Sequence, residues 1–391
     1  MMGKRVGMEV SIAAAEAVKQ ANADVIAAYP ITPQTHIVEH LSELVADGEL
    51  DAEFVPVESE HSAMSVCVGA SAAGARAFTC TSSQGLILMS EIVYITASLR
   101  LPVVMILANR SLSGPLSIWN DHSDAMLIRD CGWIQVFACN GQEVYDGVFH
   151  AFRVAEDQRV LLPVMIHMDG FILTHVIESI ELVDQEAVDR YLPPRQSLYR
   201  LDPDEPVTMG AYALPNNYTE TQMAQNEALK ASYGPILEAW KEWGDLTGRH
   251  YAPVETFMAE DAEVLLLTMG ALGETASVAV EEMRAKGRPV GLVKLRLWRP
   301  FPFEEVRKAL SGAKIVVVLD RAVSFGGPGG PVASEIRSAL YREARRPAVV
   351  DFIVGIAGRD VAITDYKRMV ERAYQLAEKG PEAYELYGVR E

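Results

Sequence analysis

Short apolar runs alternate with segments of helical periodicity over the first 176 residues of the chain. The runs are five to eight residues long, and they are hydrophobic throughout, as strands are when helices cover both faces of a sheet. They predict strands at 24–29, 53–57, 77–82, 102–109, 133–139 and 163–169. The segments between them predict helices at 9–21, 34–46, 60–73, 84–99 and 142–156. This alternation is typical of an α/β fold with a parallel sheet.

The alternation stops after residue 176 and resumes near residue 264. Residues 192–220 contain five prolines, and a long helix is predicted at 218–246. Beyond it the pattern predicts strands at 264–270, 290–298, 314–320 and 348–355, and helices at 272–286, 303–311, 332–345 and 363–378. Because 391 residues exceed what one core usually holds, we predict three parts. They are an α/β domain at 1–190, a connecting arm with a long helix at 191–258, and a smaller α/β domain at 259–391.

Composition narrows the possible functions. The net charge of −18, from 53 acidic and 35 basic residues, argues against a nucleic-acid surface, which needs a basic footprint. Charged residues interrupt the first residues of the chain, so no signal peptide is expected, and no apolar run reaches about 18 residues, so no membrane span is expected either. The cysteines contain no CxxC pair, which argues against a zinc or iron–sulfur site and suits the thiols of a cytoplasmic protein; they are Cys67, Cys80, Cys131 and Cys139.

Polar and ionisable residues collect where the predicted strands end. The segments are "YPITPQ" at 29–34, "ESEHSAM" at 58–64, "SSQG" at 82–85 and "NRSLSGPLSIWNDHSD" at 109–124. Ligands of open parallel sheets bind beyond the carboxyl ends of the strands. Helix capping explains any one of these segments, but four on one edge favour a binding site.

The residue types at this edge suggest roles. Glu58 and Glu60 are alternative proton-transfer carboxylates, and the residues alone do not separate them. The planar guanidinium of Arg110 is a rigid fork of N–H donors that can bind a carboxylate through two hydrogen bonds. Thr32 lies between two prolines that fix its backbone, and it equally suits a helix N-cap with Pro33 at the first helical position.

Two further motifs favour structural interpretations. The "NDHSD" segment contains possible metal ligands, but carboxylates this close in sequence more often cap a helix, so no metal site is predicted. The "FGGPGG" loop at 325–330 precedes a helix, yet it lacks the P-loop lysine and the Rossmann spacing. We therefore favour a structural turn over a nucleotide site.

Longer motifs resemble a known family. "YPITPQTHIVE", "PVESEHSAM", "TSSQGLILM", "ANRSLSGPLSIWNDHSDAM", "RDCGWIQ" and "MDGFILTH", with "MGALGETA", "RLWRPFP" and "DFIVGIAGRD" further on, resemble the alpha subunit of multi-subunit pyruvate:ferredoxin oxidoreductases. The resemblance covers nearly the whole chain. It implies a thiamine-diphosphate pyrimidine-binding domain followed by a domain similar to the C-terminal unit of transketolases.

The resemblance also implies an activity and its partners. In that family a 2-oxoacid is decarboxylated on thiamine diphosphate, coenzyme A takes the acyl group, and electrons pass through [4Fe-4S] clusters to ferredoxin. Beta-, gamma- and delta-type subunits carry the clusters and the Mg²⁺–diphosphate site. This chain contains neither a GDG motif with its following asparagine nor a cysteine cluster, so the cofactor is expected to be shared with a partner subunit.

Residue roles follow from the same resemblance. It implies that Glu60, rather than Glu58, hydrogen-bonds the pyrimidine N1′ of the cofactor, and that Arg110 and Thr32 lie at the carboxylate of the 2-oxoacid. It also places four residues near the cofactor, namely Tyr29, Pro30, Ser83 and Gln84, the last two in a turn that resembles an anion nest at a helix start.

Several alternatives remain open at this point. Pyruvate is the favoured substrate, and a branched-chain, an aromatic (such as phenylglyoxylate), a 2-oxoglutarate or an oxalate specificity is the alternative. Oxalate is disfavoured because the "YPITP" turn carries no second arginine for a dianion. A non-catalytic scaffold subunit is an alternative of another class, which the retention of Glu60 and Arg110 disfavours.

Overall fold

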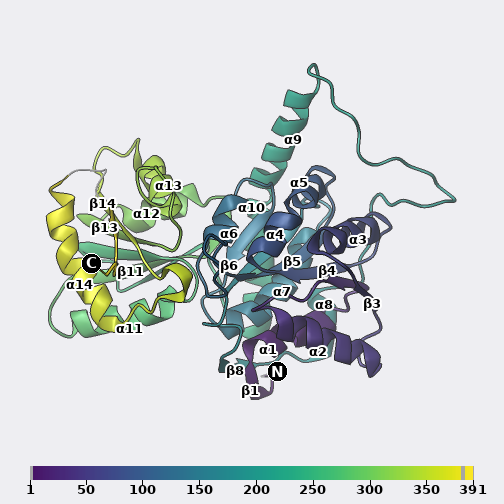
Figure 1. The fold of residues 1–391 in the computed structure, drawn as a ribbon, viewed down its shortest axis with the longest axis horizontal. Coiled ribbons are helices and arrows are strands. Elements are labelled where there is room, and N and C mark those ends of the chain that lie inside the picture. Colours follow the sequence, from purple (N-terminus) through teal and green to yellow (C-terminus); the bar gives the residue numbers. More distant parts are fainter. Residues whose placement is uncertain (1–2, 380–383, 391) are drawn as a thin grey trace.

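The computed structural model describes residues 3–379 and 384–390, and its larger unit is built on a seven-stranded sheet (Figure 1). The strand order is β12-β6-β7-β5-β4-β2-β3, and all neighbours are parallel except β12 and β6. The strands are β2 (Val25–Ala28), β3 (Glu53–Pro56), β4 (Ala77–Thr81), β5 (Val103–Asn109), β6 (Ile134–Phe137), β7 (Val164–Asp169) and β12 (Leu297–Arg299). All six strands predicted for this part are confirmed.

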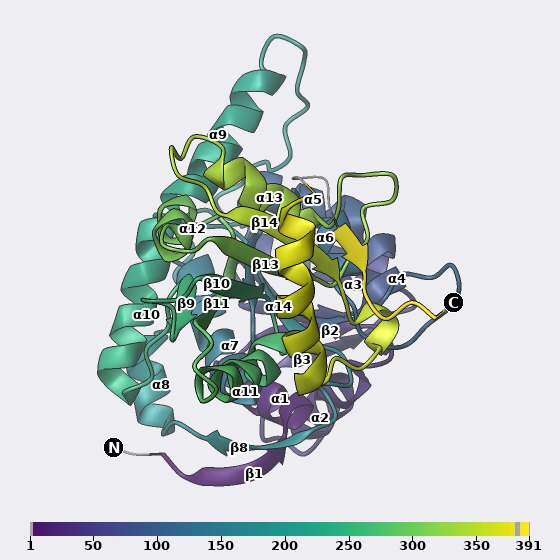
Figure 2. The same ribbon diagram turned by 90° about the vertical axis from the view of Figure 1, so that its left-hand side faces the viewer.

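Helices cover both faces of this sheet (Figures 1 and 2). They are α1 (Val10–Gln20), α2 (Thr35–Ala46), α3 (Glu60–Ala72), α4 (Ser83–Leu88), α5 (Ser90–Ser98), α6 (Ser123–Leu127) and α7 (Gly141–Ala155). Every residue of β4, β5 and β7 is buried, which explains their uniformly apolar sequences. The helix predicted at 84–99 is two helices that meet at Met89.

The smaller unit has a six-stranded sheet of order β15-β14-β13-β10-β11-β9, with only β9 antiparallel. Its strands are β9 (Val254–Phe257), β10 (Val264–Thr268), β11 (Val290–Leu295), β13 (Ile315–Asp320), β14 (Ala348–Ile353) and β15 (Tyr384–Leu386). Its helices are α11 (Leu272–Arg284), α12 (Phe303–Leu310), α13 (Pro331–Leu340) and α14 (Ile363–Ala377), with a 3₁₀ turn at Ile356–Gly358. One hydrophobic cluster includes Leu107 of β5 and Leu267 of β10, so the two units share a core.

The strand predicted at 290–298 is two strands that belong to different sheets. The chain leaves the smaller sheet at Arg296, whose buried guanidinium bonds Glu143 of α7 (2.8 Å) and Glu255 of β9 (2.8 Å), and β12 then pairs with β6. Conversely, β9 joins the smaller sheet from within the predicted arm. Each of these two strands therefore lies on the other side of the predicted division at 258/259 from the sheet that it joins. The only sequence sign of the passage to β12 is the charged Arg296 within an apolar run.

The remaining elements flank the larger unit. A two-stranded sheet pairs β1 (Arg5–Glu9) with β8 (Ile177–Glu181), and α8 (Gln185–Tyr191) follows. The long helix predicted at 218–246 is two helices, α9 (Tyr218–Ala231) and α10 (Tyr233–Thr247), separated at Ser232, and α10 packs on α7. The arm before α9 and the helix itself stand away from the body in both views (Figures 1 and 2), and no residue of α9 is buried.

Within residues 3–379 and 384–390, no helix combines the length and the apolar character that crossing a membrane would need.

Candidate active site

The four polar segments predicted at strand ends lie along one edge of the larger sheet. They follow β2, β3, β4 and β5, which are neighbours in the order β5-β4-β2-β3 and run parallel. Their carboxyl ends therefore meet at the same edge, as the sequence predicts.

Glu60 is the first residue of α3, and its side chain is buried at 6% exposure. The neighbouring Ser59 caps the helix by accepting from the amide of Ser62 (3.3 Å), so the carboxylate of Glu60 is not needed as a cap. Among the described residues, no hydrogen bond or ion pair engages that carboxylate. Gly85 approaches it so closely that a Cβ there would lie 2.6 Å from Oε1. The glutamate thus lies against bare backbone with its bonding capacity unused.

Three hydroxyl groups near the end of β4 are buried without a hydrogen-bond partner in the described part of the chain, namely Thr79, Thr81 and Ser82, and that of Thr81 shares the surroundings of Gly85 with Glu60. All three come from β4 and the residue that follows it. Buried polar groups are normally hydrogen-bonded, and each exception needs an explanation. Several such groups at the end of one strand, one of them close to the unpartnered Glu60, fit a site that receives a polar ligand.

Glu58, the alternative carboxylate, is in a different environment. Its side chain accepts a hydrogen bond from Ser62 Oγ (2.5 Å), which lowers the pKa of Glu58. This local bond occupies the carboxylate at the start of α3. The contrast favours Glu60 as the group that is free to engage a ligand.

Arg110 and Thr32 are in direct contact. The Arg110 Nη1 donates to the backbone carbonyl of Thr32 (3.0 Å), and Nε donates to the carbonyl of Ser117 (2.8 Å). The arginine is 6% exposed, and its burial lowers the pKa of the guanidinium, against the opposing charge of Asp124. These bonds fix the fork between the turn after β2 and the loop after β5, and Nη2 makes no hydrogen bond within the described residues.

The turn at 29–34 is held in a way that the sequence did not reveal. The buried side chain of Gln34 donates from Nε2 to the carbonyl of Tyr29 (2.9 Å) and closes the turn. Helix α2 begins at Thr35, and Gln34 precedes it, so the prediction of Thr32 as N-cap with Pro33 at the first helical position is wrong. The side chains of Tyr29, Pro30 and Thr32 are exposed at the surface.

The turn at 82–85 does not form an open anion nest. The amide of Ser83 donates to Asp124 Oδ2 (3.1 Å), and its hydroxyl donates to the carbonyl of Ser111 (2.6 Å). The amide of Gly85 bonds Ser82 within the turn. The turn therefore holds the chain's own carboxylate, so the Ser83 amide is not available to an external anion. The proximity of Ser83 and Gln84 to a cofactor stays a prediction.

The loop after β5 is tied to the smaller unit through Asp169, which sequence reasoning missed. This buried carboxylate accepts from Asn120 Nδ2 (2.9 Å), His122 Nε2 (2.7 Å), Arg321 Nη1 (3.1 Å) and the amide of Ala271 (2.7 Å). Burial alone would raise the pKa of Asp169, but the charges of Arg321 and His122 hold it below its usual range. The only sequence indication was the position of Asp169 at the end of a buried strand.

The hydrogen bonds after the "FGGPGG" loop are those of a structural turn, because side chains of this chain bind the amides at the start of α13. Asp320 accepts from the amides of Val332 (3.1 Å) and Ala333 (2.9 Å), and Asp351 accepts from the amide of Gly330 (2.6 Å). These two carboxylates occupy the start of α13, where a phosphate would otherwise bind. Burial raises the pKa of Asp351 to about 6 and, together with the Asp351 charge, raises that of Asp320 well above its usual range.

This carboxylate pair predicts a pH dependence of stability. Because the pKa of Asp351 is higher in the folded chain than in the unfolded chain, ionisation costs folding free energy as the pH rises through about 6. Asp351→Asn should therefore gain roughly 1–3 kcal/mol relative to the wild type between pH 4 and pH 8. Thermal unfolding at both pH values checks this, with the exposed Asp360→Asn as control. An equal effect of Asp351→Asn at both pH values would contradict it.

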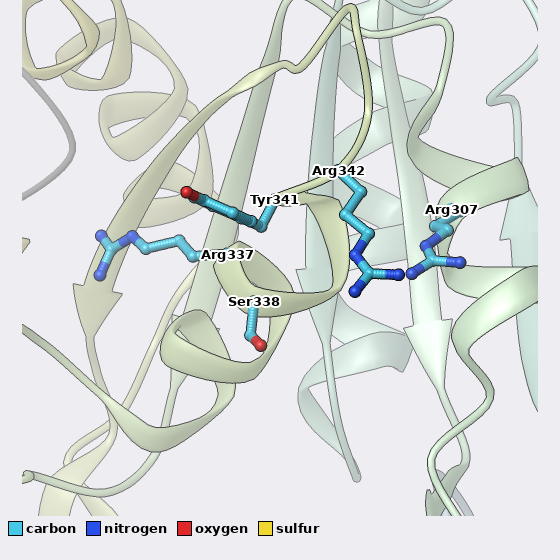
Figure 3. Close-up of a pocket in the computed structure, with 5 residues that line it drawn as sticks. All are labelled: Arg307, Arg337, Ser338, Tyr341 and Arg342. Atoms are coloured by element: carbon cyan, nitrogen blue, oxygen red, sulfur yellow. The ribbon is translucent and has the colours of Figure 1, made fainter.

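A hollow of about 470 Å³ lies at the C-terminal end of α13 (Figure 3). It is lined by Arg307, Arg337, Ser338, Tyr341 and Arg342. The side chains of Arg307 and Arg342 point toward each other, and Arg337 extends the other way (Figure 3). The hollow contains none of the predicted site residues, so it is separate from the candidate site.

The parallel α/β domain that carries the buried, unpartnered Glu60 matches a thiamine-diphosphate-binding family, and the smaller α/β unit matches a second domain of the same kind of enzyme. Residues 16–238 match the family described as "Pyruvate flavodoxin/ferredoxin oxidoreductase, thiamine diP-bdg", and residues 262–366 match "Pyruvate:ferredoxin oxidoreductase core domain II". The chain belongs to the pyruvate:ferredoxin oxidoreductase family and is a subunit of a multi-subunit enzyme.

Named relatives agree with this assignment. The chain is 49% identical to the pyruvate synthase subunit PorA of Methanothermobacter thermautotrophicus, over 92% of this chain and 93% of the relative. It is 46% identical to PorA of Pyrococcus furiosus, over 95% and 93%. It is also 45% identical to the ketoisovalerate oxidoreductase subunit VorA of Pyrococcus horikoshii, over 94% and 93%.

Solved structures support the fold. The 2-oxoglutarate:ferredoxin oxidoreductase from Magnetococcus marinus superposes with a TM-score of 0.70 at 18% identity, over 95% of this chain and 65% of that one. A split-gene transketolase, described as an inactive beta4 tetramer, superposes with a TM-score of 0.55 at 14% identity, over 95% and 100%. The α/β class expected from the sequence is thereby confirmed, and the transketolase superposes over nearly the whole chain.

Proposed function

We propose that this chain is the alpha-type subunit of an enzyme that oxidatively decarboxylates pyruvate to acetyl-CoA and CO₂ and passes the electrons to ferredoxin. The observation that carries the proposal is the pairing, at one sheet edge, of an unpartnered buried Glu60 with an Arg110 fork fixed on Thr32. The pyruvate synthase relatives supply the substrate class.

In this proposal Glu60 hydrogen-bonds the pyrimidine ring of thiamine diphosphate. When bound, that cofactor supplies the carbon nucleophile and accommodates the electron pair that remains after CO₂ departs. Glu60 is only 6% exposed, and Gly85 leaves room for its carboxylate, because a Cβ at position 85 would collide with it. The unpartnered hydroxyls of Thr81 and Ser82 are candidates for further hydrogen bonds to the ring.

Arg110 holds the carboxylate of the 2-oxoacid. Its Nε and Nη1 donate to backbone carbonyls, so the guanidinium has little rotational freedom left to lose when its free Nη2 binds a ligand. A fixed guanidinium orients the carboxylate that leaves as CO₂. The hydroxyl of the exposed Thr32, whose backbone carbonyl bonds Arg110, is the proposed second contact to this carboxylate.

The cofactor is shared with a partner subunit that supplies the Mg²⁺ and diphosphate site, and the [4Fe-4S] clusters lie on further subunits of the beta, gamma and delta type. Exposed apolar side chains flank the candidate site, among them Tyr29, Leu88 and Trp119. Such a surface suits burial against another chain.

The isolated chain should not bind thiamine diphosphate with micromolar affinity, because it has no GDG motif to hold Mg²⁺ and the diphosphate. Titration calorimetry on the purified chain measures this, and the same titration on the assembled complex is the control. Micromolar binding by the chain alone would contradict the proposed sharing of the cofactor.

A branched-chain 2-oxoacid is the second candidate substrate, because the ketoisovalerate enzyme subunit is nearly as similar as the pyruvate subunits. Substrate-dependent ferredoxin reduction by the assembled complex separates the two. The panel is pyruvate, ketoisovalerate, phenylglyoxylate, 2-oxoglutarate and oxalate, with and without coenzyme A. We expect the highest kcat/KM with pyruvate; a higher value with another acid would move the assignment to that acid, and no turnover with any would refute it.

A further inference from the structure

Two segments of the candidate site are joined by one buried carboxylate, that of Asp124 at the start of α6. Its Oδ2 accepts from the backbone amides of Ser83 (3.1 Å) and Arg110 (2.9 Å). Its Oδ1 accepts from Asn109 Nδ2 (2.9 Å) and from the amide of Ala125 (2.7 Å). Each oxygen therefore holds two donors, and the carboxylate has no capacity left for solvent or ligand.

The two amides belong to different strand ends. Arg110 directly follows β5, and Ser83 opens α4 two residues beyond β4. Ser83 has φ of 44°, in the left-handed region that a serine occupies only when its surroundings hold it there. Two residues further on, Gly85 contacts the carboxylate of Glu60. Asp124 thus links the backbone of the substrate arginine to the turn that packs on the proposed proton-transfer group.

We propose that Asp124 is the positioning residue of the site, which fixes the Arg110 fork and the turn beneath Glu60 relative to each other by clamping the amides of Arg110 and Ser83. This inference rests on the proposed function for its kinetic consequences, but the clamp itself is a property of the chain. The capping role that the sequence favours for "NDHSD" is incomplete, because the bonds of Asp124 extend to β4 and β5.

Burial raises the pKa of Asp124 to about 7, with the charge of Asp121 adding to the increase and its hydrogen bonds opposing it. The other charged groups near it are the Arg110 guanidinium and, beyond Asn109, His167, whose pKa burial lowers. Protonation turns one acceptor oxygen into a donor, so the clamp should loosen as the pH falls through about 7.

Asp124→Asn in the assembled complex is the test, because asparagine keeps the size and one acceptor but turns an N–H donor toward amides that need an acceptor. We expect KM for pyruvate to rise at least tenfold with a smaller change in kcat. We also expect hydrogen exchange at the Ser83 and Arg110 amides to accelerate at least tenfold. The rise of kcat/KM with pH near 7 should disappear in the variant.

Asp121→Asn is the matched control. Asp121 lies in the same loop and accepts from Ser123 (2.9 Å) and from Ala357 of the smaller unit (3.2 Å), without contact to the Ser83 or Arg110 amides. Because the Asp121 charge raises the pKa of Asp124, the comparison is made at pH 8, where Asp124 is largely ionised in both proteins; there Asp121→Asn should leave KM and those two amides near wild-type values. If the two variants changed KM and the exchange of those two amides equally, Asp124 would stabilise the fold in general and not position the site, and the proposal would be overturned.

Hydrogen exchange separates this inference from the proposed function. Faster amide exchange in Asp124→Asn with unchanged kinetics would overturn the positioning role and leave the function intact. If the variant does not assemble, hydrogen exchange of the wild-type complex tests the clamp instead. The Ser83 and Arg110 amides should then exchange with similar protection factors, because one carboxylate holds both. A tenfold difference between them would overturn the clamp.

Discussion

Glu60→Gln should slow pyruvate turnover by the assembled complex at least a hundredfold while the subunits remain associated. The substitution keeps the size of the side chain and replaces its ionisable oxygen with an amide nitrogen. A positioned proton-transfer group typically contributes a factor of about 10²–10⁴. Because the wild-type carboxylate has no partner among the described residues, the loss should be catalytic rather than structural. Steady-state kcat and gel filtration of the complex measure the two parts.

Glu58→Gln is the matched control, since Glu58 lies two residues before Glu60 and its carboxylate already accepts a hydrogen bond from Ser62. It should retain kcat within a few-fold of the wild type. A large loss for Glu58→Gln together with a small loss for Glu60→Gln would show that Glu58, and not Glu60, is the catalytic carboxylate.

Arg110→Leu should lower kcat/KM for pyruvate by roughly 2–4 kcal/mol, which is about thirtyfold to a thousandfold. The reason is the loss of a charge-assisted contact to the substrate carboxylate in a desolvated site. The change also removes the bonds from the guanidinium to the carbonyls of Thr32 and Ser117, so a thermal unfolding control on each variant is needed.

Two gentler variants refine the Arg110 prediction. Arg110→Lys keeps the charge but loses the planar fork, so it should retain part of the activity. Thr32→Val removes one neutral hydroxyl and keeps the carbonyl that Arg110 contacts, so it should cost about 1 kcal/mol in kcat/KM. Near-normal kcat/KM of Arg110→Leu with every 2-oxoacid tested would place the carboxylate contact elsewhere.

The sequence predicted the parallel sheets and the edge at which the site lies, because both follow from local patterns. Buried strands such as β5 are uniformly apolar, and each polar segment directly follows its strand. The location of Glu60 and Arg110 at the same edge then follows from the geometry of parallel strands.

What the sequence did not show depends on contacts between residues far apart in the chain. Asp169 meets Arg321 across 152 positions, and the anion nest expected at Ser83 is closed by Asp124, 41 positions away. The passage of the chain between sheets at Arg296 likewise depends on Glu143 and Glu255. No local sequence pattern indicates these pairs, because each of these residues could equally cap a helix or lie on the surface.

The most direct test of the central claim, that Glu60 activates a cofactor held between this chain and its partner, is the rate of hydrogen–deuterium exchange at C2 of thiamine diphosphate in the assembled complex. NMR after rapid acid quench measures that rate without substrate. We predict exchange slowed at least a hundredfold in Glu60→Gln and near wild-type in Glu58→Gln. Normal exchange in Glu60→Gln would contradict the claim.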